Sequence, residues 1–145
     1  ANKDASAFRN LSATSVSTGE LRIDAGAVTL DSFSATSQSW TGGSAYVIAD
    51  FEYGTFRTVK FVGQVSDGTD VDAFEVLVTY KGASAPADDA AIYMTTYAYM
   101  ASSGTPLGSV TAVKDGTGGT VDLKFTPGSN GTYKYAVTAT KITTQ

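Results

Sequence analysis

The stretch FRTVKFVGQVSDGTDVDAFEVLVTYK, residues 56–81, decides the class of fold. In its first half, apolar Val59 and Phe61 alternate with polar side chains, and a similar alternation fills the second half. Side chains on a β-strand point to opposite faces with a period of two, so each half predicts a strand with one buried row. Asp67-Gly68, between them, is a favoured hairpin dipeptide because both central residues of a type I′ turn need positive φ. The stretch therefore predicts a β-hairpin.

Further segments with strand-like patterns lie on both sides of the hairpin, separated by stretches rich in Gly, Ser, Thr and Asp. They cover residues 20–23, 27–33, 45–51, 91–101, 109–114, 120–125 and 132–142. Strands at this spacing are typical of sandwiches and barrels, and no segment longer than about one turn has a helical period. The sequence predicts an all-β chain of about eight to nine strands, folded as a single antiparallel, jelly-roll-like β-sandwich over residues 20–145.

The first 19 residues differ from the rest of the chain because they are polar and weakly patterned. Their large apolar side chains are Phe8, Leu11 and Val16. A segment with so few apolar residues cannot bury a core of its own and is disordered or docked elsewhere. We predict an extended N-terminal arm, residues 1–19, that docks on a partner surface through these three side chains; a short helical turn at residues 5–11 is an alternative.

Composition excludes several classes of function. The chain has 10 basic and 14 acidic residues and a net charge of −4, which argues against binding nucleic acid through phosphate contacts. It has no Cys and no His, so disulfides, the usual zinc sites and His-based acid–base or triad catalysis are excluded. No apolar stretch approaches the length of about 20 residues that is needed to span a bilayer. The N-terminus also lacks the apolar core of a signal peptide. We expect neither a nucleic-acid nor a membrane partner.

Acidic side chains are the remaining source of chemistry. Asp67, Asp70 and Asp72 alternate with other residues, but the spacing lacks the Gly and the distal Glu of a calcium loop. A glycosidase needs two carboxylates at a fixed separation beside a cleft, and no such pair stands out. We expect Glu75 to pair with Lys60 across the hairpin instead. The sequence predicts no enzyme, no catalytic residue, no metal and no cofactor.

Aromatic residues are the more informative candidates. Strict alternation places Tyr93, Tyr97 and Tyr99 on one face of the strand predicted at residues 91–101. Those rings complete a two-sided sandwich, form a subunit interface, in which Tyr is enriched, or stack on a glycan. Trp40 lies in a Ser/Thr/Gly-rich loop predicted at residues 34–44 and is either a plug over the sandwich edge or an exposed contact. These four residues are the candidates for subunit or ligand contact.

The central hairpin resembles a module repeated in virion proteins of cyanobacterial and marine tailed phages. In that module a Y/F-R-x-[AV]-K-[FY] strand runs into a Q-[IV]-[ST]-[DN] turn, as in residues 56–67, and an E-[VI]-L-[VL] strand follows, as in residues 75–78. TTYAY at 95–99, PLG at 106–108 and GTVDLKFTP at 119–127 are similar to its later segments, in the same order. The likeness covers roughly residues 20–142 and departs from the module in a longer loop at residues 82–89 and in the arm.

This resemblance implies a non-enzymatic structural protein of a tailed-phage virion, made in the host cytoplasm. In the favoured hypothesis it decorates the capsid as a cement protein, with its arm docked on the major capsid protein or another virion protein. In the alternative it is a small tail-fibre or tail-tip protein that contacts a host surface glycan. Fibre and decoration proteins also imply a homo-oligomer, in the first place a trimer.

Overall fold

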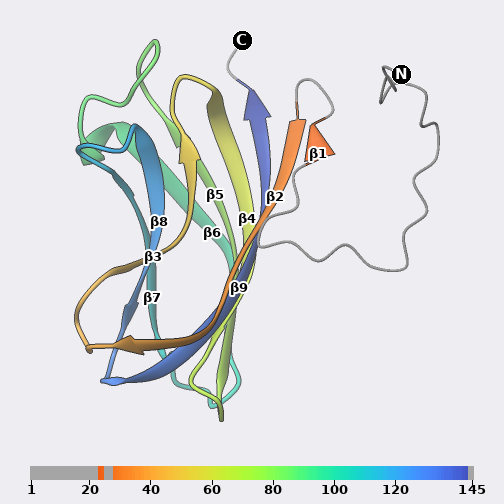
Figure 1. Cartoon of the computed structure of the whole chain (residues 1–145), viewed down its shortest axis with the longest axis vertical. Helices are drawn as coiled ribbons and strands as arrows, with labels where there is room; N and C mark the ends of the chain where they lie inside the picture. Colours follow the sequence, from red (N-terminus) through yellow and green to blue (C-terminus); the bar gives the residue numbers. More distant parts are fainter. Residues whose placement is uncertain (1–22, 25–27, 144–145) are drawn as a thin grey trace, which may run out of the picture.

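The computed structural model of the chain describes residues 23–24 and 28–143, which form an all-β sandwich, as predicted (Figure 1). The strands are β1 (Ile23–Asp24), β2 (Val28–Trp40), β3 (Tyr46–Glu52), β4 (Phe56–Ser66), β5 (Val71–Tyr80), β6 (Ile92–Ala101), β7 (Gly108–Lys114), β8 (Thr120–Pro127) and β9 (Gly131–Thr143). A 3₁₀ turn, η2 (Asp89–Ala91), precedes β6. The larger sheet has the order β1-β2-β9-β4-β5-β6, and the smaller sheet has the order β3-β8-β7.

The strand order nests the two ends of the chain. The first and last long strands, β2 and β9, are antiparallel neighbours in the larger sheet, and β3 and β8 are antiparallel neighbours in the smaller one. This nested pairing is the feature that the fold shares with a jelly roll. Strands β5 and β6 remain in the larger sheet, beside β4, and so make it twice as wide as the smaller one.

The core lies between the sheets. Alternate residues of β5, among them Phe74, Val76 and Val78, point inward and are at most 3% exposed. The smaller sheet contributes Phe51 and Phe125, which are fully buried. Burying large apolar side chains from both layers is the main source of stability in such a sandwich.

The predicted hairpin is present as β4 and β5, but its turn is not the predicted type I′ turn. Gly68 has a φ of 100°, whereas no non-glycine residue among those described has a positive φ, so Asp67 does not meet the type I′ requirement. The Asp67 side chain shapes the turn instead, because its Oδ1 accepts the backbone N–H groups of Thr69 and Asp70, each at 2.8 Å.

The prediction of a loop at residues 34–44 is wrong for most of that segment, because β2 continues to Trp40. This half of β2 pairs with β9, for example Gln38 with Tyr133 and Trp40 with Gly131, after a register shift between Ala35 and Gln38. Its Ser and Thr side chains are mostly exposed. Small polar residues are compatible with an exposed strand when a neighbouring strand completes the backbone hydrogen bonds, and here β9 does so.

The predicted N-terminal arm, residues 1–19 with Phe8, Leu11 and Val16, lies outside the described residues. The first described pairing is that of β1 with β2, in which Ile23 is opposite Leu30 and Asp24 is opposite Thr29. This agrees with the strand pair predicted from residues 20–33. The division of the chain into arm and sandwich stays a prediction.

Gly63 provides a test of how tightly the core is packed. A Cβ at this position would lie 2.7 Å from Cζ of Phe74 and 2.9 Å from Cγ2 of Val137. We expect Gly63→Ala to lower the free energy of unfolding by about 1–3 kcal/mol through overpacking, measured by urea denaturation. Gly116→Ala is the matched control, since no atom lies within 4 Å of its added Cβ, and it should change stability by less than about 0.5 kcal/mol. Equal losses in the two variants would contradict this account.

Candidate functional site

One face of the larger sheet points away from the smaller sheet, and we call it the outer face. The pairing registers place its residues in rows across β2, β9, β4, β5 and β6. Three such rows are Leu30, Thr140, Lys60, Leu77 and Thr95; Ser32, Thr138, Val62, Glu75 and Ala98; and Ser34, Ala136, Gln64, Ala73 and Met100. Small and apolar side chains predominate in these rows, although no layer of the described structure covers them.

Large apolar side chains are exposed across the outer face. Of the seven exposed large hydrophobic residues in the described part of the chain, five belong to this face and are between 42% and 65% exposed. They are Leu30, Val62, Tyr93, Met100 and Ile142. An apolar surface of this kind on a folded protein marks an interaction site or an aggregation hazard.

Charge is sparse on the same face. Lys60 Nζ lies 2.8 Å from Glu75 Oε1, which confirms the predicted cross-strand pair. Among the described outer rows, the further charged residue is Lys134, opposite Ser66 at the end of β4. Since Lys60 and Glu75 neutralise each other, the middle of the outer face has no net charge to attract an ionic ligand.

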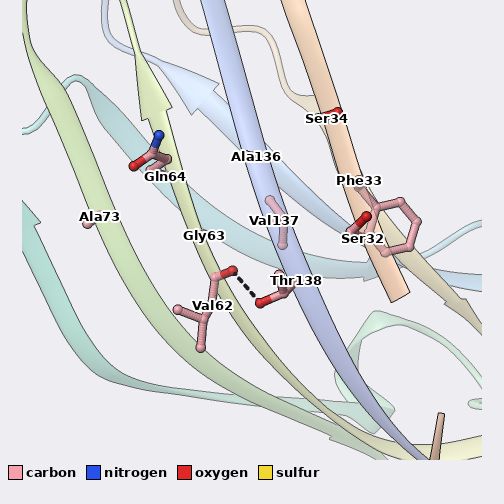
Figure 2. A pocket seen from close by; sticks show the side chains of 10 residues that line it. All are labelled: Ser32, Phe33, Ser34, Val62, Gly63, Gln64, Ala73, Ala136, Val137 and Thr138. Atoms are coloured by element: carbon pink, nitrogen blue, oxygen red, sulfur yellow. Dashed lines mark hydrogen bonds between the residues drawn. The ribbon is translucent and has the colours of Figure 1, made fainter. Parts of the chain in front are cut away.

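A hollow of about 460 Å³ lies near the centre of the outer face (Figure 2). Small side chains such as Ala73, Ala136 and Ser34 form part of its lining. Figure 2 shows Val62 and Thr138 side by side at its edge, where the Thr138 hydroxyl donates a hydrogen bond to the Val62 carbonyl at 3.2 Å. The hollow is open and mostly apolar, so an apolar side chain of a partner would fit it.

The predicted grouping of Tyr93, Tyr97 and Tyr99 on one face is wrong. The register of β6 on β5 shifts between Glu75 and Val76, because Tyr97 is an extra residue that forms a bulge. Tyr93 therefore lies on the outer face, and Tyr97 is 64% exposed at the sheet edge. Tyr99 lies opposite buried Phe74, on the inner face of the sheet.

Tyr99 is held by a buried carboxylate. Its hydroxyl donates a hydrogen bond to Oδ2 of Asp72 at 2.6 Å, and the same oxygen accepts the N–H of Leu107 at 2.7 Å. Burial, together with the hydrogen bond to Asp72 and the charge of that carboxylate, raises the pKa of Tyr99, because a tyrosinate would lie beside another anion. Asp72 thus fastens β6 and the loop before β7 to β5.

Trp40 is a core residue, 6% exposed, and not an exposed contact. Its ring stacks on Tyr46, Tyr133 and Tyr135, at centroid distances of 4.9, 5.3 and 6.0 Å. Stacked rings of this kind contribute packing beyond their buried area. Of the two predicted roles, the structure therefore supports the plug.

The loop at residues 82–89 forms a second hollow, of about 440 Å³. Lys81, Asp88 and the exposed ring of Tyr93 are part of its lining. Arg57 holds the start of the loop, since its guanidinium donates hydrogen bonds to the carbonyls of Tyr80, at 3.2 Å, and Gly82. Tyr93 thus links the outer face to this second hollow.

The sequence prediction omits Leu30, Val62, Met100 and Ile142. Val62 and Ile142 lie in rows that alternation assigns to solvent. Leu30 alternates as a buried residue would, but Thr29 and Asp31 are buried in its place. Val62, for example, directly follows Phe61, which belongs to the buried row together with Val59 and Val65. An apolar residue in both rows of a strand indicates a sheet with two covered faces, which is how the outer face could have been found.

The three aspartates weighed as calcium ligands serve other purposes. Asp67 shapes the hairpin turn, Asp70 Oδ1 accepts a hydrogen bond from the Ser102 hydroxyl at 3.1 Å, and Asp72 is buried. Within residues 28–143, no three acidic side chains gather as metal ligands would. The described part of the chain also contains no helix long and apolar enough to cross a membrane.

Comparison with known proteins gives two partial likenesses in structure. No family model and no curated protein matches the chain. The tailspike protein of Acinetobacter phage vB_ApiP_P1 is 16% identical over 94% of the chain, with a TM-score of 0.49. The tailspike protein of Acinetobacter baumannii phage AM24 is 11% identical over 81% of the chain, with a TM-score of 0.48. The chain spans only 25% and 26% of these two proteins, and similarity at this level supports no functional conclusion.

Removal of the Tyr99 hydroxyl tests the contact with Asp72. We expect Tyr99→Phe to lower the free energy of unfolding by about 1–2 kcal/mol at pH 7, through loss of a buried hydrogen bond. The folded pKa of Tyr99 is raised above its ordinary value of 10.0, so the stability that it contributes is fully present below pH 10 and is lost as the pH rises further. Urea denaturation between pH 7 and 11 should show a steeper alkaline loss in the wild type than in Tyr99→Phe. Tyr93→Phe, at an exposed ring, should keep the wild-type slope; equal slopes for all three would refute the contact.

Proposed function

We propose that the chain is a non-enzymatic structural protein of a phage particle, attached to other virion proteins through its outer face. The observation that carries the attachment is the set of five exposed large apolar side chains on that face. The phage context comes from the ordered segments at residues 56–127 that resemble virion modules. Adhesion needs no catalytic group, and the proposed attachment is stabilised by the burial of these apolar side chains against the partner.

A protein partner suits the outer face better than a polar ligand does. Leu30, Val62 and Met100 offer no hydrogen bonds, and Lys60 and Glu75 already satisfy each other. Five strands spaced about 4.8 Å apart, each contributing about seven residues, present roughly 550 Å² of projected area. This is comparable with the about 800 Å² that each partner buries in a standard interface, and apolar area contributes about 25 cal/mol per Å².

The position on the particle, shell or tail, is a finer part of the proposal. The capsid-decoration hypothesis receives no support from the comparisons. The tail-fibre alternative agrees with the names of the two solved structures, whose similarity is too low to decide. Imaging of purified particles at subunit resolution separates the two, since decoration requires many copies on the shell and a fibre only a few at the tail. The homotrimer is likewise a proposal, tested by sedimentation equilibrium.

A host glycan is the second candidate partner, and one observation favours it. Tyr93 is 53% exposed beside the second hollow, which Lys81 and Asp88 also line. An exposed ring next to a carboxylate and an ammonium combines the stacking and the hydrogen bonding that sugars require. This candidate would make the 82–89 loop, and not the centre of the outer face, the contact with the host.

Val62 tests attachment through the outer face, and Val47 is its matched control. The two valines are 46% and 45% exposed, but Val47 lies on the smaller sheet. We expect Val62→Asp to reduce incorporation into particles at least about tenfold, since a charge would be buried in an apolar interface. Val47→Asp should leave incorporation unchanged. Incorporation is measured as copies per purified particle, with circular dichroism to check that both variants fold.

Deletion of residues 1–19 separates the outer face from the predicted arm. If the outer face carries attachment, the shortened chain stays on the particle and Val62→Asp does not. If the shortened chain is lost and Val62→Asp is retained, the arm is the anchor and the proposal for the outer face is wrong.

A further inference from the structure

A lysine and an aspartate face each other inside the sandwich. Lys141 on β9 lies opposite Thr29, and Asp31 on β2 lies opposite Ala139, so the two are diagonal neighbours on the inner face. Their side chains are 4% and 3% exposed, and Nζ of Lys141 contacts Oδ2 of Asp31. Among the described residues, the buried Oδ1 of Asp31 has no hydrogen-bond partner.

The surroundings of this pair combine apolar walls with a second carboxylate. The rings of Phe33 and Phe56 have their centroids 5.4 and 5.3 Å from Nζ of Lys141. Oε2 of Glu52, at the end of β3, lies 4.0 Å from the same nitrogen. The Glu52 side chain is 58% exposed, so it connects the buried pair with solvent. The amine nitrogen of Lys141 therefore lies close to both an acyl group, that of Asp31, and a carboxylate that can carry a proton, that of Glu52.

We propose that Lys141 and Asp31 condense to an intramolecular amide that joins β9 to β2, with Glu52 carrying the proton. One ammonium proton passes to the Asp31 carboxylate, which leaves a neutral amine beside a neutral acid. The amine lone pair attacks Cγ of Asp31 and the C–N bond forms, while a second N–H proton passes to Glu52. Glu52 returns this proton to the departing hydroxyl, and the C–O bond breaks. The products are one amide and one water, with no oxidation or reduction and no co-reactant.

The site favours a reaction that the same groups do not undergo in water. The neutral amine–acid pair holds the same protons as the ion pair, and removal from water penalises the two ions more than the two neutral groups. Condensation also replaces two buried charges by one neutral amide. The fold holds the nitrogen and the carboxyl group in contact, an arrangement that gives effective concentrations far above those in solution. Water can leave along the exposed side of Glu52.

The surface pair Lys60–Glu75 is an internal comparison. It joins the same functional groups at 2.8 Å, but its side chains are 49% and 36% exposed. Solvent stabilises both of these charges, and among residues 28–143 Glu75 is the one carboxylate within ion-pair distance of Lys60. This pair therefore remains ionic, and it provides the control variant.

The mass of the purified 145-residue chain, measured after denaturation, tests the proposal. We expect the wild type to be lighter than its sequence by one water molecule, and fragmentation of a digest to join the peptides that contain Asp31 and Lys141. Lys141→Arg, which lacks the amine nucleophile, should keep the full mass. A wild-type chain of full mass, or a water loss that maps to Asp67-Gly68 or Asp115-Gly116, would overturn the proposal.

Glu52→Gln tests the proton carrier without disturbing the core, because Glu52 is largely exposed. After refolding, this variant should form the crosslink at least about a hundredfold more slowly, as expected for loss of a general base. Glu75→Gln should crosslink at the wild-type rate. If Glu52→Gln folds and crosslinks as fast as the wild type, Glu52 has no catalytic part in the reaction.

Discussion

The position of β9 between β2 and β4 is the constraint on which the rest of the structure depends (Figure 1). Its inner row, including Val137 and Ala139, is buried against the smaller sheet, and both of its edges are hydrogen-bonded. The larger sheet therefore stays in two pieces until the last strand inserts between them. Pairings between strands so far apart in the sequence carry a large loop-closure entropy, which makes such folds slow to form.

Most strands could be predicted from local sequence patterns. The features that could not be predicted depend on pairing between strands that are far apart in the sequence. The hairpin of β4 and β5 was predictable because its alternation, turn and partner all lie within residues 56–81. Trp40 was misplaced because a Ser-rich segment is compatible with a loop or with an exposed strand, and the deciding partner is β9. The bulge at Tyr97 depends on the fit of β6 to β5, so alternation alone put Tyr99 on the wrong face. The contact between Asp31 and Lys141 required the strand order.

The two faces of the larger sheet follow different packing rules. The inner face carries aromatic and branched side chains, and Gly63 is needed there to leave room for Phe74. The outer face combines small residues, which form a hollow, with exposed Val62 and Met100. An antiparallel sheet with one solvated face ordinarily places polar residues on it. The exposed Leu30, Val62 and Met100 depart from this rule, and this departure is the basis on which a protein partner is proposed for the outer face.

The antiparallel pairing of β2 and β9 also determines how the sandwich would respond to mechanical tension. The start of β2 and the end of β9 lie side by side at the same end of the sheet, where Val28 is paired with Ile142. A force applied at these two points would peel the strands apart one pair at a time instead of shearing them, and a ladder resists peeling poorly. Asp31 and Lys141 lie within the first few residues of that end of the paired strands. If an ion pair joins these two side chains, residues 32–140 bear the load once the strands have separated. If an amide joins them, the force passes through the crosslink and residues 32–140 are shielded from it.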